Sequence, residues 1–134
     1  MISIAVIDDE QKARETIINI LGLSPIELSI IGEADDVKSA YELLTLKSPD
    51  LVLLDINLPD GTGFDLLKMF DKVNFKVIFI TAHEEHAIKA FKCSAIDYIL
   101  KPITAGELFG AIEKAQETLN WIEDNIVKLL NNHS

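Results

Sequence analysis

Polar residues that could handle a phosphoryl group each come directly after a short apolar run in this sequence. They are the pair Asp8 and Asp9, then Asp55, Thr81 and Lys101. Carboxylates gathered in one place repel one another unless some hold protons or a cation lies among them. A carboxylate can also act as a nucleophile and form an acyl phosphate. These residue types therefore point to phosphoryl transfer, with Asp55 as the candidate acceptor.

The cation that suits such a cluster is Mg²⁺ or Mn²⁺, because the expected ligands are hard carboxylate oxygens with no histidine or cysteine beside them. Mg²⁺ keeps several of its waters, which leaves room for a phosphate oxygen. Lys101 adds a second positive charge, and the Thr81 hydroxyl can donate a hydrogen bond to a phosphoryl oxygen. Ala82 is small, so we expect it to leave the phosphoryl group accessible.

Alternating strand-like and helix-like segments must bring these residues together. Apolar runs at 2–7, 28–31, 51–54, 77–80 and 95–100 alternate with helical patterns at 11–23, 37–44, 64–70, 84–91 and from 104 onward. Fully apolar runs are typical of strands buried on both faces of a parallel sheet. Five such units predict an α/β fold with a five-stranded parallel sheet and helices on both faces. Ligands bind at the carboxyl edge of these sheets. If the first strand lies beside the third, Asp8, Asp9 and Asp55 share one pocket.

The motifs around these residues occur in the order of one known family. They are IDDE at 7–10, LDINLPDG at 54–61, ITA at 80–82 and LKP at 100–102. The chain thereby resembles the receiver domain of bacterial two-component response regulators. The segments HAIKAF at 86–91 and AIDYILKP at 95–102 look like the LytR/AlgR subfamily. The resemblance implies a flavodoxin-like (βα)5 receiver fold with strand order 2-1-3-4-5. It also implies a receiver joined to a C-terminal LytTR DNA-binding domain that is missing from this chain.

The resemblance assigns a role to each residue of the acidic pocket. Asp55 is then the phosphorylation site, and a sensor histidine kinase is the phosphate donor. Asp9, the Asp55 carboxylate and the backbone carbonyl of Asn57 are implied to ligate Mg²⁺. Asp8 is implied to act mainly through a bound water. The protein is expected to catalyse only its own phosphorylation and dephosphorylation, and so not to be an enzyme with an external substrate.

Four positions match the parts of the family that bind the phosphoryl group and respond to it. Thr81 and Lys101 are implied to hold the phosphoryl oxygens. The bond between Lys101 and Pro102 is expected to be cis, which would direct the lysine into the pocket. Tyr98 matches the switch aromatic, which turns inward when Thr81 moves towards the phosphate. The alternative for Tyr98 is half-buried packing without a switching role.

Other functions compete for the same residues. A phosphatase that works through an aspartyl phosphate needs a second aspartate two residues after the nucleophile, where this chain has Asn57. A flavin- or nucleotide-binding module needs a phosphate-cradling loop after the first strand. Asp8 and Asp9 in that loop would repel phosphate without a metal. The purely structural alternative is that Asp8 and Asp9 only cap the first helix.

Two histidines and the single cysteine lie near the predicted fourth helix. His83 follows Thr81 by two residues, so we expect it to border the pocket and to influence how fast water removes the phosphate. His83 and His86 have no further histidine or cysteine beside them, which argues against a second metal site. Cys93 is expected to be a buried small apolar residue.

The last helical segment is longer than its sheet requires. Thr104 and Glu107 predict a capping box at its start. An apolar seam with alternating spacings of four and three then runs through Leu108, Ile112, Ala115, Leu119, Ile122, Ile126 and Leu129. A helix over residues 104–131 would be about 42 Å long, whereas a sheet strand spans about 20 Å. We expect a receiver domain at 1–118 and, at 119–134, a linker that pairs in a homodimer or leads to an output domain. The alternative is a helix bent back onto its own domain. A second candidate surface for the homodimer is the fourth helix, fifth strand and fifth helix.

Composition limits the partners. A net charge of −10 disfavours direct contact with a nucleic-acid backbone or an anionic membrane, so DNA is expected only through a separate domain. One cysteine and no apolar leader favour the cytoplasm.

Overall fold

The computed structural model describes residues 1–132 and has the alternating element order that the sequence predicts. The strands and helices are β1 (Ile2–Ile7), α1 (Gln11–Leu21), β2 (Leu28–Ala34), α2 (Val37–Lys47), β3 (Leu51–Leu54), β4 (Asn57–Leu58), β5 (Gly61–Thr62), α3 (Gly63–Lys68), β6 (Lys76–Thr81), a 3-10 turn (Glu84–His86), α4 (Ala87–Lys92), β7 (Asp97–Leu100) and α5 (Ala105–Asn132).

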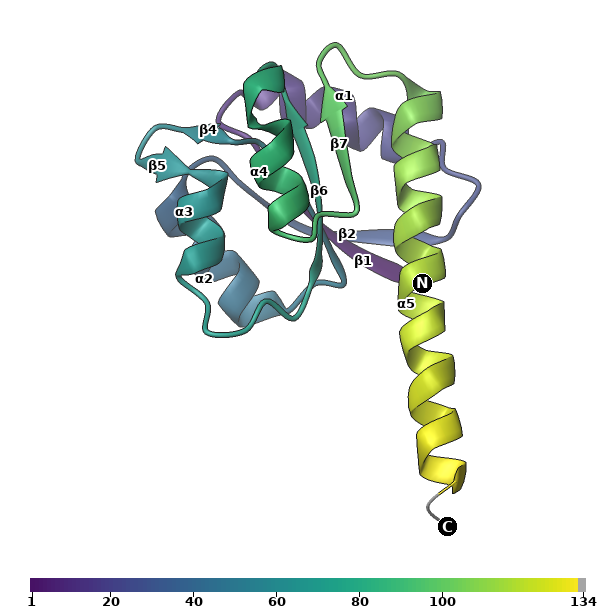
Figure 1. The fold of residues 1–134 in the computed structure, drawn as a ribbon. Helices are drawn as coiled ribbons and strands as arrows, with labels where there is room; N and C mark the ends of the chain where they lie inside the picture. The colour runs from purple at the N-terminus through teal and green to yellow at the C-terminus, as the bar shows by residue number, and fades with distance from the viewer. Residues whose placement is uncertain (133–134) are drawn as a thin grey trace.

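Five parallel strands form the sheet in the order β2-β1-β3-β6-β7 (Figure 1). Because β4 and β5 stand apart as a small antiparallel pair, this is the predicted order 2-1-3-4-5, and the fold prediction is confirmed. The central strand β3 is buried along its whole length. The order of the strands reverses between β1 and β3, which is where ligands bind in sheets of this kind.

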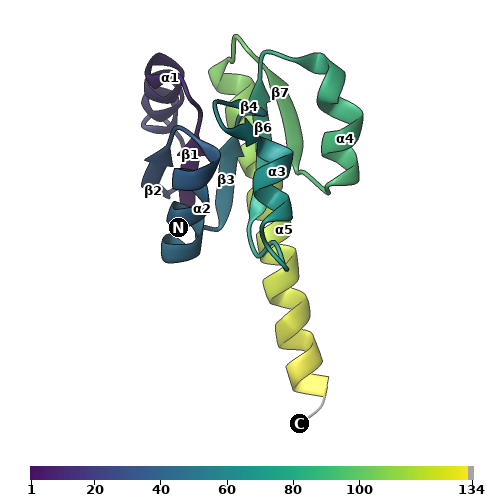
Figure 2. The same ribbon diagram turned by 90° about the vertical axis from the view of Figure 1, so that its left-hand side faces the viewer.

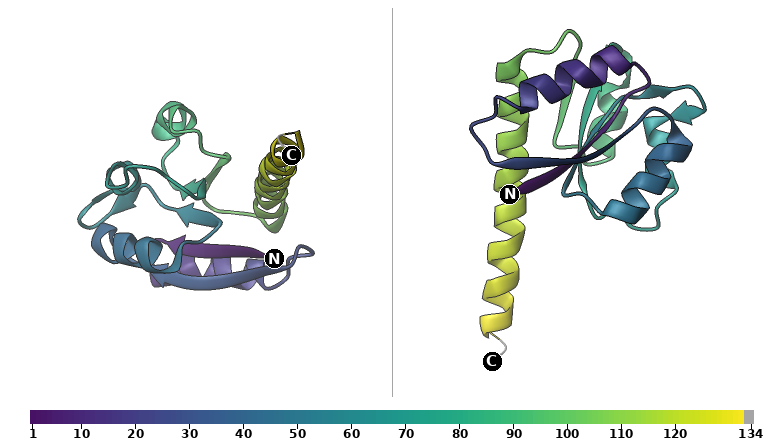
Figure 3. Two further views of the ribbon diagram at one scale, coloured as in Figure 1. Left: turned by 90° about the horizontal axis from the view of Figure 1, so that it is seen from below. Right: turned by 180° about the vertical axis from the view of Figure 1, so that it is seen from behind.

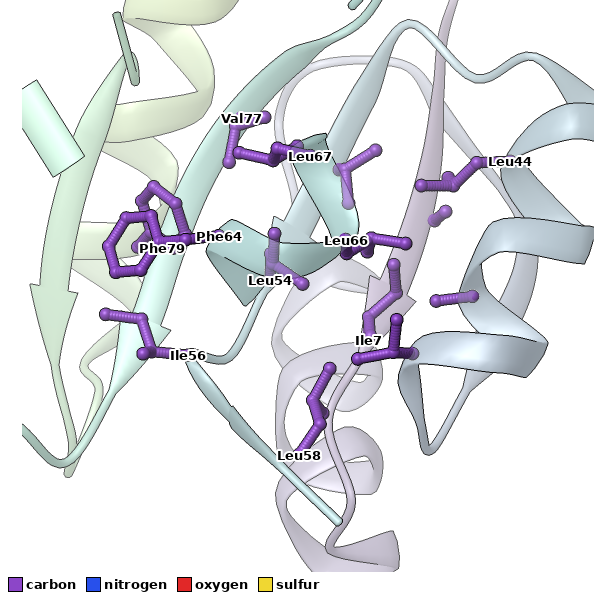
Figure 4. Close-up of a cluster of buried hydrophobic side chains, with 14 of the residues drawn as sticks. Ile7, Leu44, Leu54, Ile56, Leu58, Phe64, Leu66, Leu67, Val77 and Phe79 are labelled. Carbon is purple, nitrogen blue, oxygen red and sulfur yellow. The ribbon is translucent and has the colours of Figure 1, made fainter. Parts of the chain in front are cut away.

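The helices cover both faces of the sheet (Figures 2 and 3). On one face α1 and α5 enclose an aliphatic core with side chains such as Ile17, Ile78 and Leu108. On the other face α2, α3 and α4 enclose a core that includes the rings of Phe64 and Phe79, drawn in Figure 4. The two rings lie 5.1 Å apart between centroids, in a tilted arrangement. With an apolar core on each face, the sheet is a rigid platform for the residues at its edges.

The loop after β3 has more structure than the sequence predicts. The segment between β3 and α3 is not a plain loop, because β4 and β5 pair in it as a short antiparallel hairpin. Thr62 then caps α3, since its side chain accepts a hydrogen bond from the Asp65 backbone and the Asp65 carboxylate accepts one from the Thr62 backbone. A side chain at Gly63 would place a Cβ 2.8 Å from the backbone oxygen of Asp55. Glycine at this position therefore lets α3 begin directly against the acidic pocket.

Two boundaries and one burial prediction differ from the structure. The last strand starts at Asp97 rather than 95, and the helix expected from 84 begins as a 3-10 turn before α4. Cys93 is exposed, so the prediction that it is buried is wrong. Ala90 is the one buried residue of α4, so this short helix contacts the core through a single small side chain. Cys93 follows its last turn, at the rim of a surface hollow between α3 and α4.

Helix α5 is continuous and does not bend back onto the domain. Its first half packs on the sheet, and its second half extends past the sheet (Figure 1). Thr104 caps the helix by accepting a hydrogen bond from the Glu107 backbone, which is half of the predicted capping box. The Glu107 carboxylate accepts its hydrogen bond from the Thr104 hydroxyl instead of from the Thr104 backbone. No helix within residues 1–132, α5 included, has the length and apolar character needed to cross a membrane. The predicted boundary between 1–118 and 119–134 stays a prediction, and residues 133 and 134 lie outside the described part.

Candidate functional site

The carboxyl ends of four strands bring the predicted residues to one edge of the sheet. Asp8 follows β1, Asp55 follows β3, Thr81 ends β6 and Lys101 follows β7. Backbone hydrogen bonds continue the sheet pairing into these positions. The Asp55 N–H donates to the Ile7 oxygen at 2.9 Å, and the Lys101 N–H donates to the Thr81 oxygen at 2.9 Å. The sheet itself therefore sets where these side chains start.

Lys101 lies between two carboxylates. Its Nζ donates to Asp8 Oδ2 at 2.7 Å and to Asp55 Oδ2 at 3.0 Å. The side chain of Asp8 is only 1% exposed, and that of Asp55 is 9% exposed. The bond between Lys101 and Pro102 is cis, as predicted. One ammonium group thus serves two buried carboxylates, which leaves an excess of negative charge at the edge.

Burial shifts the titration of this cluster. It raises the pKa of the Asp8 carboxyl above its ordinary value, against the opposing effect of the Lys101 hydrogen bond, and the charge of Asp55 adds to the rise. Burial alone would lower the pKa of Lys101, but its hydrogen bonds to Asp8 and Asp55 outweigh that effect and leave the pKa above its ordinary value. Lys101 is therefore a permanent cation here, and Asp8 is a carboxyl that favours a proton or a second cation.

Asp8, Asp9 and Asp55 can converge on one ion. Each offers an oxygen, and these oxygens all lie within 4.8 Å of one another. Asp9 is exposed, so the cluster opens to solvent on its side. Within residues 1–132 no other group of three or more histidine, cysteine, aspartate or glutamate residues has this geometry.

Two buried oxygens at this edge have no hydrogen-bond partner within the described part of the chain. They are Asp55 Oδ1 and Thr81 Oγ1. Unpaired buried polar atoms are uncommon and costly. A carboxylate oxygen without a donor suits a metal ion, and a free hydroxyl suits a phosphoryl oxygen. Together with the hard-oxygen donor set, these two atoms fit Mg²⁺ and a phosphoryl group.

Asn57, the remaining predicted ligand, is the first residue of β4 and is exposed. It follows Asp55 by two residues on the same loop, on the way to the hairpin that leads into α3. Its role as a metal ligand through the backbone carbonyl stays a prediction.

Tyr98 is half-buried and tied to the loop that follows β6. Its hydroxyl donates a hydrogen bond to the backbone oxygen of His83, and its ring lies 6.2 Å from that of Phe79. Burial raises the pKa of the Tyr98 phenol, and the charge of Glu85 adds to the rise. Ala82 is exposed, as expected for a residue that leaves the site open. His83 Nδ1 lies 3.3 Å from Glu85 Oε1, so its imidazole already has a neighbour outside the pocket.

One contact of the site is absent from the sequence-based prediction. Arg14, the only arginine of the chain, donates from a terminal nitrogen to the backbone oxygen of Asp8 at 2.6 Å. Its Nε also pairs with Glu33 Oε1 at 3.1 Å. The arginine therefore ties α1 to the ends of β1 and β2. The only signal in the sequence was a lone arginine one turn into a helix, which is too common to be informative.

Comparisons with known proteins agree with this geometry. The model of the response regulator receiver domain family matches residues 4–113. A sensory transduction protein LytT of Bacillus anthracis is 38% identical over 116 residues, which are 85% of this chain and 47% of that protein. A sensory transduction protein LytR of Staphylococcus epidermidis is 39% identical over 111 residues, 81% of this chain and 44% of that protein. The chain thus spans about half the length of these relatives.

Solved structures show the same fold. The response regulatory domain of protein mrkE from Klebsiella pneumoniae superposes with a TM-score of 0.81 at 27% identity, over 89% of this chain and 98% of that one. A response regulator receiver domain protein from Clostridium thermocellum gives a TM-score of 0.78 at 30% identity, over 91% of this chain and 99% of that one.

Proposed function

The chain belongs to the response regulator receiver domain family, and from that premise we propose that Asp55 accepts a phosphoryl group from a sensor histidine kinase in a Mg²⁺-dependent reaction. Its similarity to LytT and LytR proteins extends the proposal to the output, which would be a LytTR-type DNA-binding domain. The observation that carries the proposal is the position of Asp55. Its Oδ2 lies 3.0 Å from Lys101 Nζ, and the residue offers an oxygen within 4.8 Å of oxygens of Asp8 and Asp9.

In the proposed reaction an Asp55 oxygen attacks the phosphorus of a phosphohistidine on the kinase. The P–N bond breaks, the electron pair stays on the imidazole nitrogen, and an acyl phosphate forms on Asp55. A Mg²⁺ held by Asp8, Asp9 and Asp55 would neutralise charge on the phosphoryl oxygens. Lys101 provides the second positive charge from the other side, and its raised pKa keeps it charged. The domain would catalyse only this transfer and the hydrolysis of the acyl phosphate, in which water takes the phosphoryl group and the Asp55 carboxylate is restored.

The response to the phosphate would pass through Thr81 and Tyr98. The Thr81 hydroxyl has no partner within the described part of the chain and can donate to a phosphoryl oxygen. Movement of Thr81 at the end of β6 shifts the loop that holds the His83 carbonyl, to which the Tyr98 hydroxyl is bonded. We expect that bond to break as Tyr98 turns inward. The surface of α4, β7 and α5 would change with it, and either this surface or the extension of α5 would support self-association.

The test is incubation of the protein with Mg²⁺ and acetyl phosphate, read by intact mass. We expect a gain of one phosphoryl group that EDTA prevents and that Asp55→Asn abolishes. Asp60→Asn is the matched control, because Asp60 lies on the same loop and accepts hydrogen bonds from the Val37 and Lys38 backbone instead. Equal phosphorylation of the wild type and Asp55→Asn, or none in either, would contradict the proposal.

A further inference from the structure

A hollow of about 380 Å³ lies between α3 and α4, on the face of the sheet that carries the aromatic core. Its floor is apolar and includes Phe64, Phe75 and Val77, which also belong to that core; Phe64 and Val77 are labelled in Figure 4. Small molecules usually bind in concave sites of about 300–1,000 Å³ that are lined by apolar side chains and a few polar groups. The size and the floor of this hollow therefore suit a small ligand with an apolar body.

The hollow stays open because α4 packs on the sheet through a small side chain. Ala90 is its buried residue, whereas its large apolar residues Ile88 and Phe91 are 73% and 65% exposed, and neither of them lines the hollow. Just after the helix, Ser94 has a positive φ of 60° and the chain turns towards β7. The large apolar side chains of α4 are therefore not used to fill the space beside α3.

The charged residues that line this hollow are all lysines. They are Lys68 of α3, Lys76 of β6 and Lys89 of α4. Three of the 12 lysine and arginine residues thus gather at one hollow of a protein whose net charge is −10. A hollow of the same volume between α2 and α3 is lined by Asp50 and Asp71 as well as by a lysine. The excess of positive charge is therefore a property of the hollow between α3 and α4, and it favours a negatively charged ligand.

These lysines have no carboxylate that neutralises them at close range. Within residues 1–132 none of the three forms an ion pair. Lys89 reaches from α4 towards α3, where its Nζ lies 4.6 Å from the centroid of the Phe64 ring. The pKa of the nearby Asp65 carboxyl is lowered mainly by its hydrogen bonds with Thr62, and less by the charges of Lys68 and Lys89. Asp65 is thus held by Thr62 and does not line the hollow, which leaves the ammonium groups available to an anion.

We propose that the hollow between α3 and α4 binds a small amphiphilic carboxylate, with its apolar body on Phe64 and Val77 and its charged end beside Lys68 and Lys89. The apolar body would leave water on binding, and the carboxylate would pair with ammonium groups at the rim. Inorganic phosphate would leave the apolar floor uncovered, and a neutral amphiphile would leave the lysines without a partner, so both should bind more weakly. The hollow shares no residue with the acidic cluster, so the proposal does not depend on phosphorylation of Asp55.

Cys93 can report on this site, because it lines the hollow, is exposed and is the single cysteine of the chain. The test measures by intact mass how fast iodoacetamide alkylates Cys93 at rising concentrations of octanoate, octanol or inorganic phosphate. We expect octanoate to slow the alkylation in a saturable way, and octanol and phosphate to have much weaker effects. Protection by octanol equal to that by octanoate would mean that charge is not recognised, and equal protection by phosphate would mean a simple anion site. Either result, or no protection by octanoate, would overturn the proposal.

Two lysines of α4 provide a matched pair of variants. Lys89→Ala should raise the octanoate concentration that gives half protection by up to about fivefold, the range for a solvent-exposed ion pair. Lys92→Ala is the control, because Lys92 lies on the same helix beside Cys93 but does not line the hollow. Octanoate should also shift the amide NMR signals of α3 and α4, a readout that does not use the thiol. Equal effects of the two variants, or no shifts in these helices, would contradict the proposal. Asp55→Asn should be protected like the wild type, which keeps this outcome separate from the phosphorylation test.

Discussion

Two aspartates bracket the central strand β3, and they differ in almost every physical respect. At the amino end, Asp50 Oδ2 accepts hydrogen bonds from the Ser3 backbone at 3.0 Å and from the Ser3 hydroxyl at 3.1 Å. The Asp50 N–H donates back to Ser3 Oγ at 2.9 Å. At the carboxyl end, Asp55 shares one lysine with Asp8 and leaves Oδ1 without a partner among residues 1–132.

The difference separates a structural carboxylate from a functional one at the two ends of the same strand. Asp50 is paired with donors from β1 and so stabilises the junction of two strands. Asp55 lies in a cluster with more negative than positive groups, which costs stability in the absence of a cation. Because an ion would relieve this excess of negative charge, the repulsion at the carboxyl edge favours binding of a cation, and with it a phosphoryl group. The Asp50 carboxylate at the amino edge of the sheet therefore stabilises the fold, whereas the carboxylates at the carboxyl edge lack enough positive charge to balance them.

The largest expected effect on the free energy of unfolding comes from removing the positive charge of Lys101 at the carboxyl edge of the sheet. Lys101→Met should lower the free energy of unfolding by about 2–3 kcal/mol in EDTA, because Asp8 and Asp55 then face each other without a counter-charge. The value is below that of a fully buried pair because Lys101 is 23% exposed. Urea denaturation measures the loss, and Mg²⁺ should recover most of it. A loss that Mg²⁺ does not reduce would mean that no ion binds at this edge.

A smaller effect is expected at the amino edge of the sheet. Asp50→Ala should cost about 1–2 kcal/mol, since it leaves the Ser3 N–H without its acceptor. Neither Mg²⁺ nor EDTA should alter this cost, and phosphorylation of Asp55 should proceed as in the wild type. The same urea titrations and the acetyl phosphate assay supply both readouts. If Asp50→Ala reduced phosphorylation as strongly as Asp55→Asn, the separation of the two edges would be wrong.

The smallest effect concerns pH. Because the folded-state pKa of Asp8 is raised above its ordinary value of 3.8, its protonated form favours the folded state. The contribution of Asp8 to stability is therefore fully present below 3.8 and is lost as pH rises through the raised pKa. In EDTA, the wild type should gain stability relative to Asp8→Asn when the pH falls from 7 to about 4. An identical pH dependence in the two proteins would show that burial does not perturb Asp8.

Most of the fold was predictable because its signals are local. The run Leu51–Leu54 is apolar throughout, so its burial on both faces and its place in a parallel sheet follow from sequence. The positions of Asp8, Asp55, Thr81 and Lys101 follow as well, because each comes directly after such a run. The sheet geometry then brings them together without further information.

What sequence could not predict depends on contacts between distant segments. Ser3 and Asp50 are 47 residues apart, and neither has a neighbour that marks it as a partner. The contacts of Arg14 depend on how α1 lies against β1 and β2, and the exposure of Cys93 depends on how little of α4 is buried. The apolar seam of α5 was visible in the sequence, but how far along the helix the sheet buries it was not.

The junction of α5 with the sheet has a mechanical consequence. Lys114 of α5 pairs with Asp97 of β7 at 2.9 Å, one residue before Tyr98. From residue 116 to 132 the helix extends by about 25 Å at 1.5 Å per residue. A tilt of about 5° at the Asp97 anchor would move its tip by about 2 Å over that length. The helix would therefore act as a lever that pivots beside Tyr98. A tilt too small to disturb the core would move the tip of the helix as far as helices shift at subunit interfaces.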